Sequence, residues 1–392
     1  MSRRLVGIVG VLTLAGLAAP ARSQVAPPRP EWAKGVRGWG VLEVGGAPGS
    51  RPLEQKVWKR GTLVAQDGRD NIYLLEAIAG TVQVWAPNGD KRDEWPIPGW
   101  QPTEASPILS GFACDRRGET FVAATRGQVR VFTRDEMLQS FTVPTLVTGV
   151  VVVKDEILAA HVPVKFGHQE GQDKAQQEPF YRDPYLVTGF TMKGEPLSSS
   201  LPPDKAAGAD ALSLGMTQDI CIATDDREEA VWVADRHRLY RLRRLSASGS
   251  VAAEWTSDTV RAGVAFGGEA PADVAQNLTP KAAAAFRPVR ASMTVRDLVA
   301  RRGFVFTLMS PHAVADAAVI DIFSSPGEGP LWRIALGGGS GTVYGQLAVT
   351  DAGFWLFPAV SGTPRWIERP ADWVMEQSIG SRASDGASEN SE

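Results

Sequence analysis

Short apolar runs, separated by turns rich in Asp and Gly, recur along most of this chain. The clearest copy has apolar runs at residues 63–65, 72–75 and 82–85, with turns at 67–70 and 87–90. Runs of this length, bounded by Asp and Gly turns, are typical of β-strands joined by tight hairpins. The pattern therefore predicts a unit of short antiparallel strands.

Five further units follow the first, at a spacing of about 40 to 50 residues. The second unit has strands at 111–114, 120–123 and 128–132, and the third at 150–153, 157–160 and 185–190. The last three units place their strands at 220–223, 231–234 and 239–242; at 293–295, 304–308, 319–323 and 331–334; and at 345–349, 354–357 and 365–367. We therefore expect six copies of one strand-built unit.

Repeats of this length, built from short strands, are the signature of a β-propeller in which each unit is one blade. A single blade leaves its faces bare, so the blades must pack side by side in a closed ring. The sequence therefore predicts an all-β fold, a six-bladed β-propeller over residues 39–376. We expect the strand-like segment 39–44 to complete the last blade and residues 371–375 to dock against the ring.

The hairpin that Asp115 and Gly118 form before the strand 120–123 has an Asp-x-x-Gly pattern, and the strand 231–235 is comparable. These repeats resemble the six-bladed propellers of the NHL-repeat and TolB-like group over residues 63–368, although the third, fifth and sixth units depart from the pattern. The resemblance implies a protein that binds proteins, peptides or glycans, and some relatives are lactonases or other hydrolases. The fold alone does not choose between these functions.

Residues 1–23 have the layout of an export signal. Arg3 and Arg4 precede the apolar run 5–19, and small residues flank the predicted cleavage site before Gln24. An uncleaved membrane anchor is the less favoured alternative, because the run is short for a bilayer. Without the aromatic-leucine pair of twin-arginine signals, the general secretory route is favoured. We expect a periplasmic or secreted protein with a proline-rich linker at 24–38 and a disordered tail at 377–392.

Net charge limits the classes of partner that this protein is expected to bind, and the two cysteines bear on disulfides and lipid anchors. The 392 residues carry a net charge of -3, and removal of Arg3, Arg4 and Arg22 with the signal takes it to -6. Nucleic acids and anionic membranes attract basic proteins, so neither is an expected partner. Cys114 and Cys221 each lie in an apolar run, which favours two separate buried thiols over a disulfide. Neither cysteine is the first residue after the predicted cleavage site, so no lipid anchor is expected.

Sharp catalytic motifs are missing from the sequence: it has no zinc-protease helix motif, nucleophile elbow, phosphate loop or EF-hand. The four histidines, His161, His168, His237 and His312, show no metal-ligand spacing. His161 ends a strand beside an inserted loop, where it faces either a pocket mouth or, in the favoured interpretation, the protein interior. No metal or cofactor is expected.

Acidic residues gather in the predicted hairpin turns. Carboxylates at 225–229 offer the oxygen ligands that calcium prefers, but the favoured interpretation is a solvated hairpin tip. Asp67, Asp115 and Asp351 are expected to accept backbone hydrogen bonds within their own turns. Metal-dependent propeller hydrolases use asparagines around the channel, and Asn71 and Asn277 are the only two outside one turn and the tail. This scarcity weakens the hydrolase interpretation.

Two insertions interrupt the repeats, at residues 165–184 and 264–290, and the second contains a predicted short helix at 281–286. Loops on a rigid ring are where propellers bind. We single out Phe180, Tyr181, Arg182 and Tyr185 as contact residues, although packing of this cluster onto its own blade is equally consistent. Trp95 and Trp100 lie near prolines and are expected to be exposed contacts as well.

These observations favour a non-enzymatic interaction module that binds an envelope or extracellular protein, peptide or glycan through loops on one face. The alternative is a metal-assisted hydrolase, similar to lactonases or esterases, with its site in the central channel. A third hypothesis is a glycan-binding module that uses exposed aromatic residues.

Overall fold

The structure, a computed structural model, describes residues 38–368 apart from a set of gaps. The gaps are 44–50, 60, 102–108, 126, 144, 167–179, 183–184, 205–217, 226–227, 229, 237–239, 258–264, 267–287, 290–293, 311–317, 325–328 and 338–341. The predicted export signal (residues 1–23), residues 24–37 of the predicted linker, residues 371–375 and the C-terminal residues 377–392 lie outside the described residues. Within the described ranges, no helix is long and apolar enough to cross a membrane.

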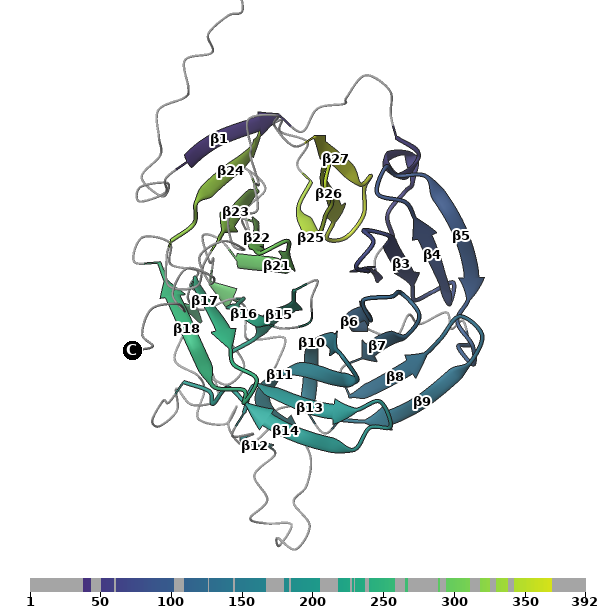
Figure 1. The fold of residues 1–392 in the computed structure, drawn as a ribbon, viewed down its shortest axis with the longest axis vertical. Helices are drawn as coiled ribbons and strands as arrows, with labels where there is room; N and C mark the ends of the chain where they lie inside the picture. The colour runs from purple at the N-terminus through teal and green to yellow at the C-terminus, as the bar shows by residue number, and fades with distance from the viewer. Residues whose placement is uncertain are drawn as a thin grey trace, which may run out of the picture.

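Six β-sheets are arranged around a common axis (Figure 1). The first sheet contains β2 (Thr62–Gln66), β3 (Ile72–Glu76), β4 (Thr81–Trp85) and β5 (Lys91–Pro96). The second contains β6 (Leu109–Cys114), β7 (Phe121–Thr125), β8 (Gln128–Phe132) and β9 (Met137–Thr142). The third contains β10 (Thr145–Val153), β11 (Glu156–Phe166), β13 (Val187–Thr191) and β14 (Pro196–Ser200).

The remaining three sheets continue the circle. The fourth contains β15 (Ile220–Thr224), β16 (Val231–Asp235), β17 (Arg241–Leu245) and β18 (Val251–Thr256). The fifth is built on β21 (Thr294–Arg301), β22 (Phe304–Ser310), β23 (Val319–Phe323) and β24 (Trp332–Gly337). The sixth contains β25 (Tyr344–Val349), β26 (Gly353–Pro358) and β27 (Arg365–Glu368). The first strand of each sheet lies nearest the axis, so the protein is a six-bladed β-propeller and the predicted fold is confirmed.

Two short ribbons lie outside the blades and fall within the two predicted insertions. β12 (Phe180–Arg182) pairs with the end of β11, and β19 (Ala265–Phe266) pairs with β20 (Pro288–Val289). Both insertions therefore contain strand pairing, whereas the predicted helix at 281–286 lies outside the described residues.

The blades bury both of their faces against their neighbours. In β3, Ile72 and Leu74 pack into the core shared with the sixth blade, and Tyr73 and Leu75 pack into the core shared with the second. Successive side chains of a strand point to opposite faces, so a strand buried on both faces needs apolar residues at consecutive positions. This requirement explains the short, uninterrupted apolar runs of the sequence.

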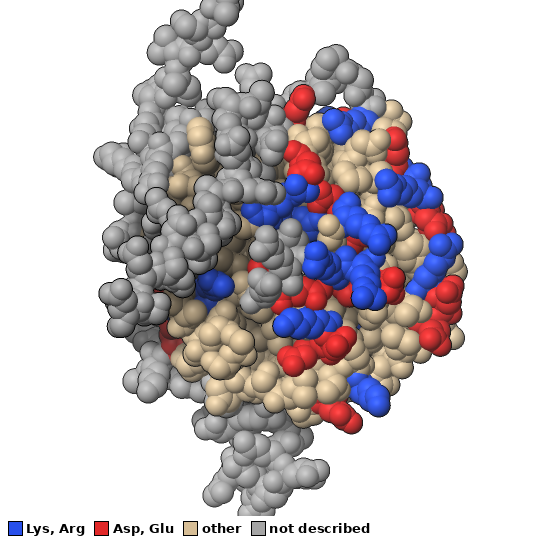
Figure 2. All heavy atoms as spheres, viewed as in Figure 1, with Lys and Arg blue, Asp and Glu red and all other residues tan. Residues whose placement is uncertain are grey.

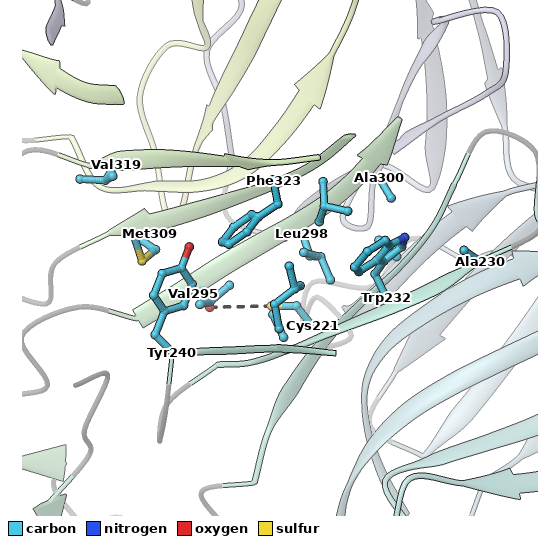
Figure 3. Close-up of a cluster of buried hydrophobic side chains, with 14 residues drawn as sticks. Cys221, Ala230, Trp232, Tyr240, Val295, Leu298, Ala300, Met309, Val319 and Phe323 are labelled. Atoms are coloured by element: carbon cyan, nitrogen blue, oxygen red, sulfur yellow. Dashed lines mark hydrogen bonds between the residues drawn. The ribbon is translucent and has the colours of Figure 1, made fainter. Parts of the chain in front are cut away.

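The core between the fourth and fifth blades is shown in Figure 3. Trp232 and Tyr240 of the fourth blade pack there with Leu298 and Phe323 of the fifth. The Tyr240 hydroxyl donates to the buried carboxylate of Asp321 at 2.7 Å. A buried hydroxyl without a hydrogen-bond partner is unfavourable, so this bond allows a tyrosine to be buried in an otherwise apolar core.

The prediction for the N-terminal strand is wrong in its partner. β1 (Gly38–Glu43) pairs in parallel with β24 and extends the fifth blade, with Gly38 opposite Trp332 and Glu43 opposite Gly337. The sixth blade keeps three strands in the described residues. A parallel strand needs only an open edge of suitable length, and the sequence of 39–44 does not specify which blade offers that edge.

Residues 51–58, which we call the N-terminal strap, occupy the outer edge of the sixth blade. The strap contains a 3-10 helix, η2 (Pro52–Gln55). The backbone N–H of Trp366 donates to the Glu54 carboxylate at 3.0 Å, and Trp58 N donates to Gly362 O at 2.7 Å. Leu53 and Trp58 are fully buried against the blade. The strap therefore supplies an acceptor for one backbone N–H of β27, that of Trp366, which a fourth strand would otherwise pair.

Two glutamine side chains join the first and sixth blades beside the axis. Gln346 of β25 accepts from Val64 N at 2.8 Å and donates to Thr62 O at 3.0 Å. Gln66 of β2 accepts from Val349 N at 3.1 Å and donates to Val349 O at 2.6 Å. The ring is thus closed by side-chain amides at the axis and by the strap at the rim.

Candidate functional site

The two faces of the ring differ in the length of their connections. On the turn face, each blade joins its first strand to its second by a short turn, as between β2 and β3 or β10 and β11. The opposite face carries the connections between blades and those between second and third strands, which include β12 and the β19–β20 ribbon. We call it the insertion face.

Charged residues from different blades bind one another at the axis on the turn face. Arg301 Nη2 donates to Asp67 O at 2.6 Å and also binds the Asp70 carboxylate, so the fifth blade is linked to the first. Arg302 pairs with Asp70 at 2.9 Å and with Asp351 of the sixth blade. Asp70 and Arg301 are both buried, so this is a desolvated ion pair.

A glutamate of the fourth blade extends these contacts to the other blades. Glu228 accepts from Arg116 N of the second blade at 3.0 Å and from Lys154 N of the third at 2.6 Å. Gly68 N of the first blade donates to Arg116 O at 2.9 Å. We call the connected residues the turn hub, which comprises Asp67, Gly68, Asp70, Arg116, Lys154, Glu228, Arg301, Arg302 and Asp351.

Four hub residues have left-handed backbones: Asp70 (φ 64), Lys154 (φ 55), Glu228 (φ 57) and Arg302 (φ 54). This conformation costs an L-residue roughly 1–2 kcal/mol, so the hub contacts must hold it in place. Figure 2 shows basic and acidic side chains crowded together near the middle of this face, without a field of one sign. The axial carboxylates of the described hub are therefore already engaged.

The predicted role of the turn acids is confirmed at two positions. Asp67 Oδ1 accepts from the N–H groups of Arg69 and Asn71 at 2.8 and 2.9 Å, and Asp115 Oδ1 accepts from Glu119 N at 2.8 Å. Asp351 instead pairs with Arg302. In the described part of the chain, no group of three His, Cys, Asp or Glu residues is arranged to hold a metal. Asp226 and Glu229 of the acidic turn lie outside it.

At the insertion-face end of the axis, four inner strands contain an extra residue. These residues are Ser110 in β6, Thr148 in β10, Arg296 in β21 and Gly345 in β25. Each lies where two residues of the inner strand oppose one residue of the next strand. Such bulges redirect side chains and are common at the rims of rings and beside functional sites.

The bulge in β21 places two arginines together between the fourth and fifth blades. Arg236, directly after β16, pairs through Nε with Asp219 Oδ2 at 3.1 Å, and its Nη1 donates to Arg296 O at 2.9 Å. The backbone fixes the same junction, since Val295 N donates to Arg236 O at 3.1 Å. We call Arg236 and Arg296 the arginine pair.

The second member of the arginine pair lacks an acidic partner. Arg296 is half-buried, its Nε is fully buried, and no carboxylate of the described residues binds it. Burial lowers the pKa of the Arg296 guanidinium, and the neighbouring charge of Arg236 lowers it further. The Arg296 guanidinium therefore has no carboxylate partner among the described residues, in contrast to Arg301 and Arg302 of the turn hub.

The residues around the arginine pair are occupied by structural bonds. Asp297 accepts from Leu298 N at 2.9 Å and Leu347 N at 2.7 Å, while burial raises its pKa to about 6. Burial also raises the pKa of the Cys221 thiol to about 12. Cys114 and Cys221 are both unpaired, as predicted, although Cys114 is only half-buried. A thiol with so high a pKa is a poor nucleophile.

The expectation that Trp95 and Trp100 are exposed is wrong. Trp95 lies in β5, is 7% exposed, and packs against Phe121 with ring centroids 5.7 Å apart. Trp100 is 8% exposed and its Nε1 donates to Ala77 O at 3.1 Å. Both indoles fill the core between the first and second blades, where large aromatic surfaces gain most from burial.

His161 has the structural environment that the sequence favoured. Its side chain is 1% exposed, with Nδ1 3.2 Å from Val162 O and Nε2 3.0 Å from Thr188 Oγ1. The other three histidines lie outside the described residues. His161 therefore does not reach a pocket mouth.

The four remaining predicted contact residues lie on the insertion face. Phe180, Tyr181 and Arg182 form β12, and Tyr185 is 37% exposed just beyond it. β11 exchanges partners along its length, pairing with β13 up to Ala160 and with β12 from Val164. The ribbon thus continues past the blade, and the binding role of these four residues stays a prediction.

Sequence reasoning missed the arginine pair and the turn hub. The Arg296–Asp297 dipeptide interrupts an apolar strand, and two adjacent charges break the period-2 pattern in the way that a bulge requires. That signal was available for Arg296. The hub could not be found in this way, because its members come from six separate turns.

No protein-family model matches this chain, and no curated protein matches it. Solved structures do show similarity. A streptogramin B lyase structure is 8% identical, with a TM-score of 0.41, covering 79% of each chain. The β-propeller domain of Cps50 (Swd1) from Myceliophteria thermophila is 10% identical, with a TM-score of 0.42, covering 80% of this chain and 98% of that one.

BamB from Moraxella catarrhalis is a further similar structure, 9% identical with a TM-score of 0.37, covering 79% of this chain and 97% of that one. The assignment of this chain to the β-propeller fold rests on its own six sheets. The NHL-repeat type, which the sequence suggested, stays a prediction.

Proposed function

We propose that this protein is a periplasmic or secreted interaction module that binds another envelope or extracellular component at its insertion face. The observation that carries the proposal is the asymmetry of the ring. The turns of the turn face bind one another through the hub, whereas both extra ribbons, and Arg296 without a carboxylate partner in the described residues, belong to the insertion face. A rigid ring with elaborated loops on one face is suited to recognition.

The hydrolase alternative receives less support from the site. Metal-assisted hydrolysis in a propeller needs carboxylates that converge on the axis with oxygens free for an ion. The axial carboxylates of Asp70 and Glu228 bind arginines and backbone N–H groups of other blades. Both oxygens of each carboxylate are thus already used within the ring, which leaves fewer lone pairs for an ion.

A quantitative pull-down from envelope extract tests the proposal. Phe180→Ala/Tyr181→Ala/Arg182→Ala changes the ribbon, and Arg69→Ala/Arg117→Ala changes exposed positions on the turn face as a matched control. We expect the ribbon variant to lose at least tenfold of the component captured by the unaltered protein, and the control to retain it. Equal capture by both variants, or turnover of ester and lactone substrates by purified protein, would overturn the proposal.

A further inference from the structure

The arginine pair differs from the other buried arginine sites of the protein. Arg333 binds Asp321, Arg243 binds Asp235 at 2.6 Å, and Arg301 binds Asp70. Each of these guanidinium groups has a carboxylate, which is the usual condition for burying an arginine. Arg296 has none among the described residues.

The two acids beside the arginine pair already bind other groups. Asp219 pairs with Arg236, and both oxygens of Asp297 accept backbone N–H groups, from Leu298 and from Leu347 of the next blade. Neither acid can turn to Arg296 without leaving its present partner unsatisfied. The Nε–H of Arg296 is one of several buried arginine Nε–H groups without an acceptor. What sets Arg296 apart is a half-buried guanidinium charge with no carboxylate in the described residues, a setting that favours an anion from outside the ring.

The location of Arg296 suits an external ligand. It is the extra residue of the bulge in β21, at the insertion-face end of the axis, and a bulge aims its side chain away from the regular strand positions. The backbone bonds that join Arg236 to Val295 and Arg296 hold both arginines at one junction. The guanidinium is therefore positioned in advance, which reduces the entropy lost on binding.

We propose that Arg296, backed by the positive charge of Arg236, is an anion subsite at the insertion-face end of the axis and takes a carboxylate group of the bound component. The planar guanidinium matches a carboxylate through two parallel N–H···O bonds. This inference deepens the proposed function and rests on it for the identity of the ligand's carrier, but the subsite itself is defined by residues of the ring.

Titration of the purified protein with sodium acetate tests the subsite, with sodium chloride at equal ionic strength as the control. The Nε–H of Arg296 is buried, so it exchanges slowly with water and gives an arginine side-chain signal in ¹H–¹⁵N spectra. Arg296→Gln assigns that signal by its loss. We expect a saturable shift with a millimolar midpoint for acetate and none for chloride.

Thermal unfolding provides the second measurement. We expect saturating acetate to raise the Tm by about 2 °C relative to chloride, by preferential binding to the native state. The rise should vanish in Arg296→Gln, persist in part in Arg296→Lys, and remain intact in Arg69→Gln, an exposed arginine on the turn face. Because Arg296 has no acid to lose, Arg296→Gln is expected to fold.

The inference is overturned if acetate and chloride act alike on the Arg296 signal, or if inorganic phosphate shifts it while acetate does not. Failure of the proposed function gives a different result: the ribbon variant would keep its pull-down partner while the acetate titration stayed positive. The two experiments therefore fail independently.

Discussion

Asp70 lies at the centre of the turn hub, and its two carboxylate oxygens are shared between two arginines of the fifth blade. One of these, Arg301, is buried, and the other, Arg302, is 39% exposed at its side chain. A charge pair in low dielectric is worth more than one in water, but only while both partners remain. The two arginines should therefore contribute very differently to stability.

Arg301→Met should lower the free energy of unfolding by about 3 kcal/mol, because it leaves a buried carboxylate with one exposed partner. Arg302→Met, which removes a partner from the same carboxylate, should cost less than about 1 kcal/mol. Urea unfolding of both variants measures the difference. Equal losses would mean that burial does not decide the strength of these pairs.

Asp297, at the insertion-face end of the axis, should make the free energy of unfolding depend on pH. Its pKa in the native protein is about 6, against 3.8 for an ordinary aspartate, so the native state holds its proton more tightly than the unfolded chain. The free energy of unfolding should then fall as the pH rises from about 4 to about 6, by about 2 kcal/mol from this residue. Asp297→Asn should flatten that part of the stability profile, and an unchanged slope would assign it to another group.

At the scale of elements, the sequence predicted those strands whose two faces are both buried. Consecutive apolar residues mark such strands directly, as in β3 and β7, and the Asp turns mark their ends. Trp95 was misjudged because a tryptophan near prolines resembles a loop residue, whereas it lies on an outer strand facing the next blade. The bulges were not predicted. Only the bulge in β21 has a local sign, the adjacent charges of Arg296 and Asp297, and elsewhere an extra residue is visible only against the partner strand.

The N-terminal strap shows how a segment that is not a β-strand can cover the edge of a sheet. Glu54 supplies one acceptor oxygen to Trp366 N, and the surrounding apolar residues exclude water from that bond. Glu54→Ala should therefore cost about 2 kcal/mol of unfolding free energy, by leaving a buried N–H unsatisfied. Glu54→Gln keeps an acceptor oxygen and serves as the control in thermal unfolding. A loss as large for glutamine as for alanine would indicate that the charge, and not the acceptor, matters.

At the scale of the whole molecule, the number of blades followed from the repeats, but the manner of closing the ring did not. Six similar units imply a ring because each needs two neighbours. Which residues join the first unit to the last depends on contacts between distant positions, such as Gln66 with Val349, 283 residues apart, and Val64 with Gln346, 282 residues apart. No local pattern carries that information, and none shows that Arg236 lies beside Arg296.

The junction between the first and sixth blades should be held closed in part by one side-chain amide, that of Gln346. Gln346→Ala removes the acceptor of Val64 N and the donor to Thr62 O. We expect hydrogen exchange of the Val64 amide to accelerate at least tenfold, while the amides of β15 in the fourth blade keep their rates, because opening is local. Acceleration in every blade would show that the ring opens as one unit.

The segment that precedes the first blade is spread over two blades that come last in the chain: β1 runs along the fifth, and the strap runs along the sixth. In a polypeptide delivered from its amino end, these residues emerge long before the surfaces that receive them have been made. The N-terminal residues of the domain are therefore the last to make their contacts, and the ring is not closed until β27 has emerged.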